Sequence, residues 1–349
     1  MKWTAVDLFA GAGGATQGLK NAGFSVLAAI ELDAAAGRTF SANHPEVLPF
    51  WEDIASLSPS AIRKCLELER GALTLLKACP PCQGFSTLGA GAGDDARNDI
   101  VAEVWRFLRD FRPKVFVVEN VPGLKKDRRF ERLLRQSRSV GYSVRTYVVD
   151  AANFGVPQRR RRLIAIGLRG GSQSRFPEQL ASAAAKRMDV SPRPADEAIA
   201  MAGLVGESAD SLHRVRQTTA AVRRRIAAVP IGGTRFDLPK EHRLACHDRL
   251  EGRRATASYG RIRIGQVAPT MTTRCTTAAC GSFIHPTENR AITLREAALL
   301  QTFPPSYRFD GTHAQIERQI GNALPVKLAE ALGWIVRDML GDEGGCGTV

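Results

Sequence analysis

A short cysteine motif carries the strongest chemical signal in the sequence. Residues 79–82 are C-P-P-C and follow an apolar run at 73–78 that predicts a β-strand. Cys82 therefore falls in the loop after a strand, at the edge where open α/β sheets bind ligands. A C-x-x-C spacing is typical of a redox pair, of half a zinc site, or of the surroundings of one nucleophilic thiol.

Two of these three interpretations lack support elsewhere in the sequence. No small thioredoxin-like domain surrounds the motif, which weighs against a redox pair. No second matching pair is present for zinc, because Cys275 and Cys280 are five residues apart, and we predict no metal site. Inert buried cysteines would leave the neighbouring prolines and Gly84 unexplained.

A carboxylate and two arginines follow other predicted strands. Glu119 ends the Val-rich run at 114–118, and a carboxylate at the end of a buried strand is costly unless it has a partner or a role. Four arginines at 159–162 enter a further predicted strand. Because side chains alternate along a strand, Arg160 and Arg162 share one of its faces.

A glycine-rich turn near the N-terminus predicts a nucleotide or nucleoside site. Residues 7–14 include Gly11, Gly13 and Gly14 between a predicted strand and a predicted helix, and Glu31 follows about 20 residues later. Such a turn lets a ligand approach the backbone, and such an acid can bond ribose hydroxyls. A plain tight turn explains the glycines equally well, and the spacing differs from the G-x-G-x-x-G pattern of NAD-binding proteins.

Strands alternate with helices through the first 170 residues, which predicts a mostly parallel α/β sheet. Strands are expected at 3–9, 25–30, 73–78, 114–118, 142–149 and 163–167, and helices at 15–22, 34–42, 100–111, 130–140, 293–301 and 325–340. After Gly170 the sequence becomes Arg-rich, Ala-rich and irregular, and a smaller irregular β-rich domain is expected there. The length of 349 residues also suggests two domains.

The charge balance favours a polyanionic partner. The net charge is +14, and residues 211–263 hold 13 Arg and Lys against 4 Asp and Glu, a net charge of +9. A solvated basic face is the plainer alternative. No run of 18 apolar residues predicts a membrane span, and Asp7 comes too early for a secretory signal. We expect a cytoplasmic protein whose polyanionic partner is nucleic acid first and an anionic membrane second.

These features together resemble the DNA (cytosine-5)-methyltransferases of bacterial restriction-modification systems. The resemblance is an ordered series of six motifs that covers nearly the whole chain. They are 7–14, Pro81-Cys82-Gln83, Glu119-Asn120-Val121, Gln158 with Arg160 and Arg162, 293–296 with 301–304, and 319–323 with Pro325. Cys79-Pro80 and Thr16 are small departures from the family pattern.

The resemblance implies a role for each matching residue. It implies the Rossmann-like fold of S-adenosylmethionine-dependent methyltransferases, with Cys82 as the nucleophile, Glu119 as the acid at ring nitrogen 3, Arg162 on the ring carbonyl and Arg160 in support. The cofactor is S-adenosylmethionine. The positions that match cofactor contacts are Phe9, Gly11, Gly13, Gly14, Glu31, Asp53, Ile54, Pro81, Ile100 and Asn322. Since Asn322 lies near the end of the chain, the C-terminal helix is expected to pack beside the first strand.

The resemblance also implies a division of labour along the chain. Residues 1–170 would bind cofactor and do chemistry, 171–290 would recognise double-stranded DNA, and 291–349 would complete the catalytic domain. We expect a monomer that associates with the nucleoid through DNA, with a cognate restriction endonuclease in the cell and no stable complex between them. One branch of the family methylates transfer RNA, but its variable region is shorter than the roughly 120 residues found here. A non-catalytic DNA-binding paralogue would have lost Cys82, Glu119 or a cofactor glycine.

Overall fold

The computed structural model describes residues 3–81, 100–207, 209–245 and 257–341. Its centre is a seven-stranded sheet in the order β3-β2-β1-β4-β5-β7-β6. The strands are β1 (Thr4–Leu8), β2 (Ser25–Ile30), β3 (Leu48–Phe50), β4 (Leu75–Ala78), β5 (Val115–Asn120), β6 (Tyr142–Asp150) and β7 (Arg161–Arg169). Strands β1 to β5 pair in parallel, whereas β7 runs antiparallel to both β5 and β6. The predicted mostly parallel α/β sheet is confirmed.

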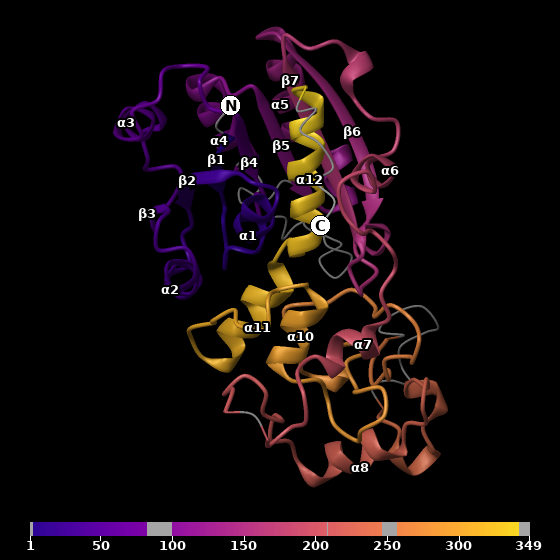
Figure 1. Cartoon of the computed structure of the whole chain (residues 1–349). Helices are drawn as coiled ribbons and strands as arrows, with labels where there is room; N and C mark the ends of the chain where they lie inside the picture. The colour runs from indigo at the N-terminus through magenta and orange to yellow at the C-terminus, as the bar shows by residue number, and fades with distance from the viewer. Residues whose placement is uncertain (1–2, 82–99, 208, 246–256, 342–349) are drawn as a thin grey trace, which may run out of the picture.

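Helices cover both faces of the sheet (Figure 1). They are α1 (Gly14–Asn21), α2 (Ala34–Asn43), α3 (Pro59–Cys65), α4 (Ile100–Phe111), α5 (Arg128–Ser139), α6 (Leu180–Ala184), α7 (Ala195–Ala200), α8 (Ala220–Ala228), α10 (Leu294–Leu300), α11 (His313–Asn322) and α12 (Val326–Met339). In α4 the buried residues recur every three or four positions, which is the spacing of one helix face. Helices α3, α4 and α5 share a core with one face of the sheet, and α1, α6 and α12 share a core with the other.

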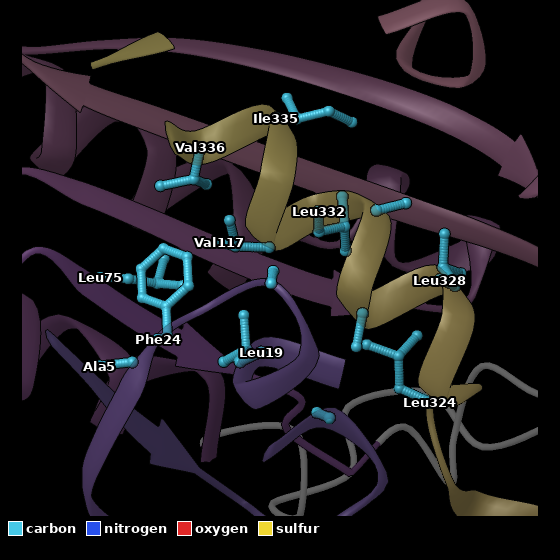
Figure 2. Close-up of a cluster of buried hydrophobic side chains, with 14 of the residues drawn as sticks. Ala5, Leu19, Phe24, Leu75, Val117, Leu324, Leu328, Leu332, Ile335 and Val336 are labelled. Atoms are coloured by element: carbon cyan, nitrogen blue, oxygen red, sulfur yellow. The ribbon is translucent and has the colours of Figure 1, made fainter. Parts of the chain in front are cut away.

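The C-terminal helix packs against the N-terminal part of the chain, as expected. Figure 2 shows Leu332 of α12 beside Val117 of the sheet, in a cluster that also contains Leu328 of α12, Leu19 of α1 and Leu75 of β4. The approach is close, because a Cβ on Gly18 of α1 would lie 2.3 Å from the Val326 carbonyl oxygen. Only glycine allows the two helices to meet at this distance.

A second group of elements lies below the sheet in Figure 1 and contains α7, α8, α10 and α11. One hydrophobic core joins α7 and residues 262–283 to α10 and α11, and a smaller one surrounds Ile226 of α8. In place of the expected β-rich structure, the described residues between 170 and 293 form short helices, turns and isolated β-bridges. Weak periodicity in this segment left its turns indistinguishable from short strands.

Candidate active site

The candidate site lies at the carboxyl edge of the sheet, where the strand order reverses. The chain runs from β1 outwards to β3 and then returns to β4 on the other side of β1. The loops after β1 and β4 therefore diverge, and ligands of open α/β sheets bind in the crevice between such loops. Because β7 is antiparallel, its first residues, Arg161 and Arg162, reach the same edge as the end of β5.

Glu119 and Arg162 form a buried ion pair at this edge. The Arg162 Nε lies 2.7 Å from Glu119 Oε1, and the two side chains are 11% and 9% exposed. Glu119 pairs with Ile164 across the β5–β7 ladder, so Arg162 lies two residues away on the same face of the sheet. Because both side chains are largely excluded from water, removal of either one would leave the other charge without compensation. The strand-terminal carboxylate therefore has Arg162 as its partner.

Beneath this pair lies a second buried ion pair that the sequence analysis did not identify. The Lys77 Nζ lies 2.8 Å from Asp7 Oδ1, and the Thr16 hydroxyl donates a 2.7 Å hydrogen bond to the other Asp7 oxygen. Burial alone would lower the pKa of Lys77, but the charge of Asp7 and its hydrogen bond with Lys77 raise it above its usual value. The pair joins the ends of β1 and β4, so it fixes the two strands that border the crevice.

Cys79 follows β4, is half-buried and lies beside Glu119. Ala78 pairs with Val118 in the β4–β5 ladder, which brings the next residue of each strand together. Burial raises the pKa of the Cys79 thiol well above its usual value, and the adjacent Glu119 carboxylate adds to the increase. Cys79 therefore remains a thiol at neutral pH, which makes it a poor nucleophile.

The chain leading to Cys82 is tied to β5. Asn120 donates a 2.9 Å hydrogen bond from its side chain to the Pro80 carbonyl oxygen and accepts one from the Val121 N–H. Pro81 is the last described residue of this loop and is exposed. Cys82 itself lies outside the described residues, so its predicted role stays a prediction.

The glycine-rich turn has the backbone conformation that its sequence requires. Gly11 and Gly13 have φ angles of 55° and 89°, in the left-handed region that favours glycine. A Cβ on Gly11 would have no atom within 4 Å, so open space lies above it. Phe9 also has a left-handed φ, of 58°, and strained bulky residues of this kind cluster at binding sites.

Glu31 is attached to this turn. Its Oε2 accepts a 2.8 Å hydrogen bond from the Gly11 N–H, and its Oε1 accepts from the N–H groups of Leu32 and Asp33 at 2.9 and 2.8 Å. A carboxylate offers about four acceptor sites. One site therefore remains for a hydroxyl of a bound ligand.

The remaining predicted cofactor residues lie in different segments of the chain and differ in exposure. Asp53 is exposed after β3, and its side chain accepts a hydrogen bond from the Ala55 N–H, while Ile54 is buried in the α4 core. Ile100 is the first residue of α4, and Asn322 is the exposed last residue of α11. Their contacts with the cofactor stay predictions.

Arg160 has a different environment from Arg162. It is buried and donates hydrogen bonds to the carbonyl oxygens of Met271 and Gly321 at 2.9 and 2.8 Å. Gln158 is buried nearby, accepts a hydrogen bond from the Met271 N–H and donates to Gln301. These contacts join β7 to the segment after residue 268 and to α11. We therefore interpret Arg160 as a residue that positions neighbouring segments.

No helix among the described residues is long and apolar enough to cross a membrane. In the same ranges, no group of three or more His, Cys, Asp or Glu side chains could hold a metal ion.

The chain belongs to the family of C-5 cytosine-specific DNA methylases, whose family model matches residues 3–335. It is 33% identical over 344 residues to the Type II methylase M.HgiDII of Herpetosiphon aurantiacus, covering 96% of this chain and 95% of the relative. It is 32% identical over 369 residues to the Type II methyltransferase M.DdeI of Desulfomicrobium norvegicum, covering 94% and 86%.

Solved structures share the fold. A chain from E. coli described as a DNA modification methyltransferase encoded within a prophage superposes with a TM-score of 0.74 at 24% identity, covering 98% of this chain and 100% of that one. The Spodoptera frugiperda protein DNMT2 superposes with a TM-score of 0.64 at 17% identity, covering 95% and 99%. At these identities the likeness concerns the fold alone.

The protein is therefore a DNA (cytosine-5)-methyltransferase of the Type II restriction-modification class that uses S-adenosylmethionine and acts on DNA. Methylation of transfer RNA, the alternative activity named in the sequence analysis, is not better supported than methylation of DNA. The residues at the crevice fit the cofactor in two respects. The space above Gly11 is open where a side chain would otherwise stand, and Glu31 has acceptor capacity for a hydroxyl.

Proposed function

We propose that this enzyme methylates carbon 5 of a flipped-out cytosine within a specific duplex sequence, through a covalent adduct with Cys82. The buried Glu119–Arg162 pair carries the proposal. A carboxylate and a guanidinium at one edge can hold ring nitrogen 3 and the ring carbonyl together. Asn120, the residue after Glu119, donates a hydrogen bond to the carbonyl oxygen of Pro80, two residues before Cys82.

Carbon 5 of cytosine is a poor nucleophile until the ring is activated. The Cys82 thiolate adds to carbon 6, and the electron pair released into the ring makes carbon 5 reactive. Glu119, protonated from solvent before the addition, donates its proton to nitrogen 3 as charge develops there and takes it back when the thiolate leaves, while Arg162 holds the carbonyl oxygen. S-adenosylmethionine supplies the methyl group. A base then removes the carbon-5 proton, and the returning electron pair expels the thiolate.

Cofactor contacts are proposed for the residues around the crevice. Glu31 would bond the ribose hydroxyls, and Phe9 and the three turn glycines would line the site. The other proposed contacts are Asp53, Ile54, Pro81, Ile100 and Asn322.

A cytosine stacked in a duplex cannot reach this edge, so the base must leave the helix at a cost of a few kcal/mol. Residues 171–290 would recognise the duplex and recover that cost, while 1–170 and 291–349 do the chemistry. We further infer that the enzyme acts as a monomer in the cytoplasm, where the chromosome lies, beside a restriction endonuclease that it does not bind stably.

Covalent trapping tests the proposal. Duplex DNA with 5-fluorocytosine at the target should form a denaturant-stable adduct with the enzyme once the methyl group is transferred, because no proton at carbon 5 can then leave. Peptide mapping should place the adduct on Cys82. Cys82→Ala should give neither adduct nor product while still binding DNA.

Cys79→Ala is the matched control, because it removes the other thiol of the same motif. It should keep most of the activity and still form the adduct. An enzyme that methylates ordinary DNA but never forms the adduct would refute the covalent mechanism. Equal loss in Cys79→Ala and Cys82→Ala would return a paired-cysteine site to consideration.

A further inference from the structure

A chain of hydrogen bonds supports the underside of the glycine-rich turn. The Tyr307 hydroxyl donates to the Ala12 carbonyl oxygen at 2.6 Å. The His44 Nε2 lies 3.0 Å from the same hydroxyl, and the Lys20 Nζ lies 3.4 Å from His44 Nδ1. Tyr307 is 295 residues from Ala12 in the sequence. The turn is thus held by a side chain that reaches it from the far end of the chain.

The direction of these hydrogen bonds follows from the number of available protons. Burial raises the pKa of Tyr307, and the charge of Asp7 adds to the increase, so the phenol keeps its single proton. That proton is used by the Ala12 carbonyl, so His44 Nε2 must be the donor to the Tyr307 oxygen. Burial, together with the charge of Lys20, lowers the pKa of His44 to about 4. A neutral His44 with its proton on Nε2 therefore accepts from Lys20 at Nδ1.

Packing fixes both rings in this arrangement. Tyr307 contacts Phe303 and Phe309 at centroid distances of 4.7 and 5.4 Å, and His44 contacts Phe40 at 4.9 Å. A Cβ on Gly13 would lie 2.6 Å from the Tyr307 oxygen and 2.8 Å from His44 Nε2. The two side chains therefore fill the space directly beneath the turn.

Both polar groups of the Ala12–Gly13 peptide are satisfied on this inner side. The Gly13 N–H donates to the Ala10 carbonyl oxygen at 3.0 Å, and the Ala12 carbonyl accepts from Tyr307. A glycine tolerates both left-handed and right-handed backbone, so this peptide could reverse if one of its groups lost its partner. The Tyr307 hydroxyl opposes such a reversal, because the buried carbonyl would lose its hydrogen bond.

We propose that Tyr307 and His44 are positioning residues for S-adenosylmethionine, which hold the Ala12–Gly13 peptide in the orientation that receives the cofactor. The inference rests on the proposed assignment of this turn to the cofactor. Neither residue contacts the reacting atoms, so their effect should appear in cofactor binding and leave the chemical step nearly unchanged.

Tyr307→Phe and Tyr142→Phe form a matched pair of variants. Each variant removes one buried phenol hydroxyl and keeps the ring. The Tyr307 hydroxyl donates to the Ala12 carbonyl oxygen at 2.6 Å, and the Tyr142 hydroxyl donates to the Pro113 carbonyl oxygen at 2.7 Å. Tyr142 lies at the start of β6, on the strand farthest from β3. Both variants should lose similar stability in urea, which controls for a merely structural role.

Cofactor affinity is measured by calorimetric titration with S-adenosylmethionine without DNA. Tyr307→Phe should raise its Kd about three- to tenfold, and Tyr142→Phe by less than about twofold. The kcat of Tyr307→Phe at saturating cofactor should stay within about twofold of the wild-type value. His44→Gln, which keeps an N–H donor near the Nε2 position, should bind more tightly than His44→Leu.

Equal Kd values for Tyr307→Phe and Tyr142→Phe would overturn the inference. Glu31→Ala separates this failure from failure of the cofactor assignment itself. If Glu31→Ala weakens binding and Tyr307→Phe does not, only the positioning role is wrong. If neither variant changes the Kd, the cofactor does not use this turn.

Discussion

The ion pair between Glu119 and Arg162 gives a prediction whose size follows from burial. At 2.7 Å the attraction is about 6 kcal/mol for an effective dielectric constant of about 20, and desolvation of both groups offsets much of it. An exposed pair would contribute about 0–1 kcal/mol. With exposures of 11% and 9%, this pair should behave as a buried one, in which removal of one partner is far more costly than removal of both.

A double-mutant cycle measures this difference. Arg162→Met should lower the free energy of unfolding by about 3–5 kcal/mol, because the carboxylate stays buried without its cation. Glu119→Gln should also be destabilising, whereas the double variant Arg162→Met/Glu119→Gln should recover to within about 1–2 kcal/mol of the wild type. Urea unfolding at pH 7 supplies all four values.

The same variants separate stability from catalysis. Glu119→Gln should lower kcat by a factor of about 10² to 10⁴, because the amide cannot share a proton with the ring. The double variant should be at least as inactive although its stability recovers. A coupling energy below about 1 kcal/mol would mean that the pair acts as an exposed one, and the argument from burial would then be wrong.

Two further predictions concern pH and salt. The pKa of His44 is about 4 in the folded state and about 6.5 in the unfolded state, so the unfolded state binds more protons between these two values. The contribution of His44 to the free energy of unfolding should therefore rise by about 3 kcal/mol from pH 4 to pH 6.5. In urea unfolding, His44→Gln should show a flatter pH profile than the wild type. If about six phosphates are contacted, log affinity for DNA should fall against log salt with a slope near −5. Replacing the exposed Arg223 and Arg224 by Gln should reduce this slope by up to about 2 for all DNA sequences alike, whereas Arg225→Gln should mainly lower stability, because Arg225 packs on Tyr259. An unchanged slope in the first variant would remove those two arginines from the DNA contact.

The sequence predicted the elements of the sheet lobe, residues 3–169, well because the sequence signals for these strands and helices are local. Apolar runs between glycine-rich turns located six of the seven strands, with β2 correct to the residue. Strand β3 is only three residues long and carries no periodicity. Helices α3 and α11 were missed although both begin with a capping residue, Ser58 before Pro59 and Thr312 before Gln315.

The site was predicted only in part. The shared edge of Glu119 and Arg162 followed from the motifs, but the ion pair between Asp7 and Lys77 did not, because a lysine within an apolar strand has no local signal for its partner. Tyr307 could not be assigned to the cofactor turn, since the contact joins segments at opposite ends of the sequence.

Charge in the basic segment was the least informative signal. Arg261 is buried and donates to the carbonyl oxygens of Val229, His285 and Glu288, so it organises the segment internally. Arg235 is also buried. Composition counts these arginines with the exposed ones, although a buried guanidinium cannot reach a phosphate.

The packing of the second lobe, which contains α7, α8, α10 and α11, suggests how recognition of a DNA sequence can be transferred between relatives. The expected boundary at residue 290 divides one hydrophobic core, because α7, Met271 and Phe283 pack with α10 and α11. Exchanging 171–290 for the segment of a relative would combine two half-cores that did not evolve together, at about 1–3 kcal/mol for each mismatched contact.

Exchanging 171–323 keeps this core within one parent except for Val326 of α12. We expect the longer chimaera to unfold at higher urea concentration than the shorter one, and any active chimaera to methylate the relative's target sequence. Sequencing the methylated positions in cellular DNA gives the specificity. If the longer chimaera were active and still methylated the original sequence, recognition would lie in the sheet lobe, and the proposed division between chemistry and recognition would be wrong.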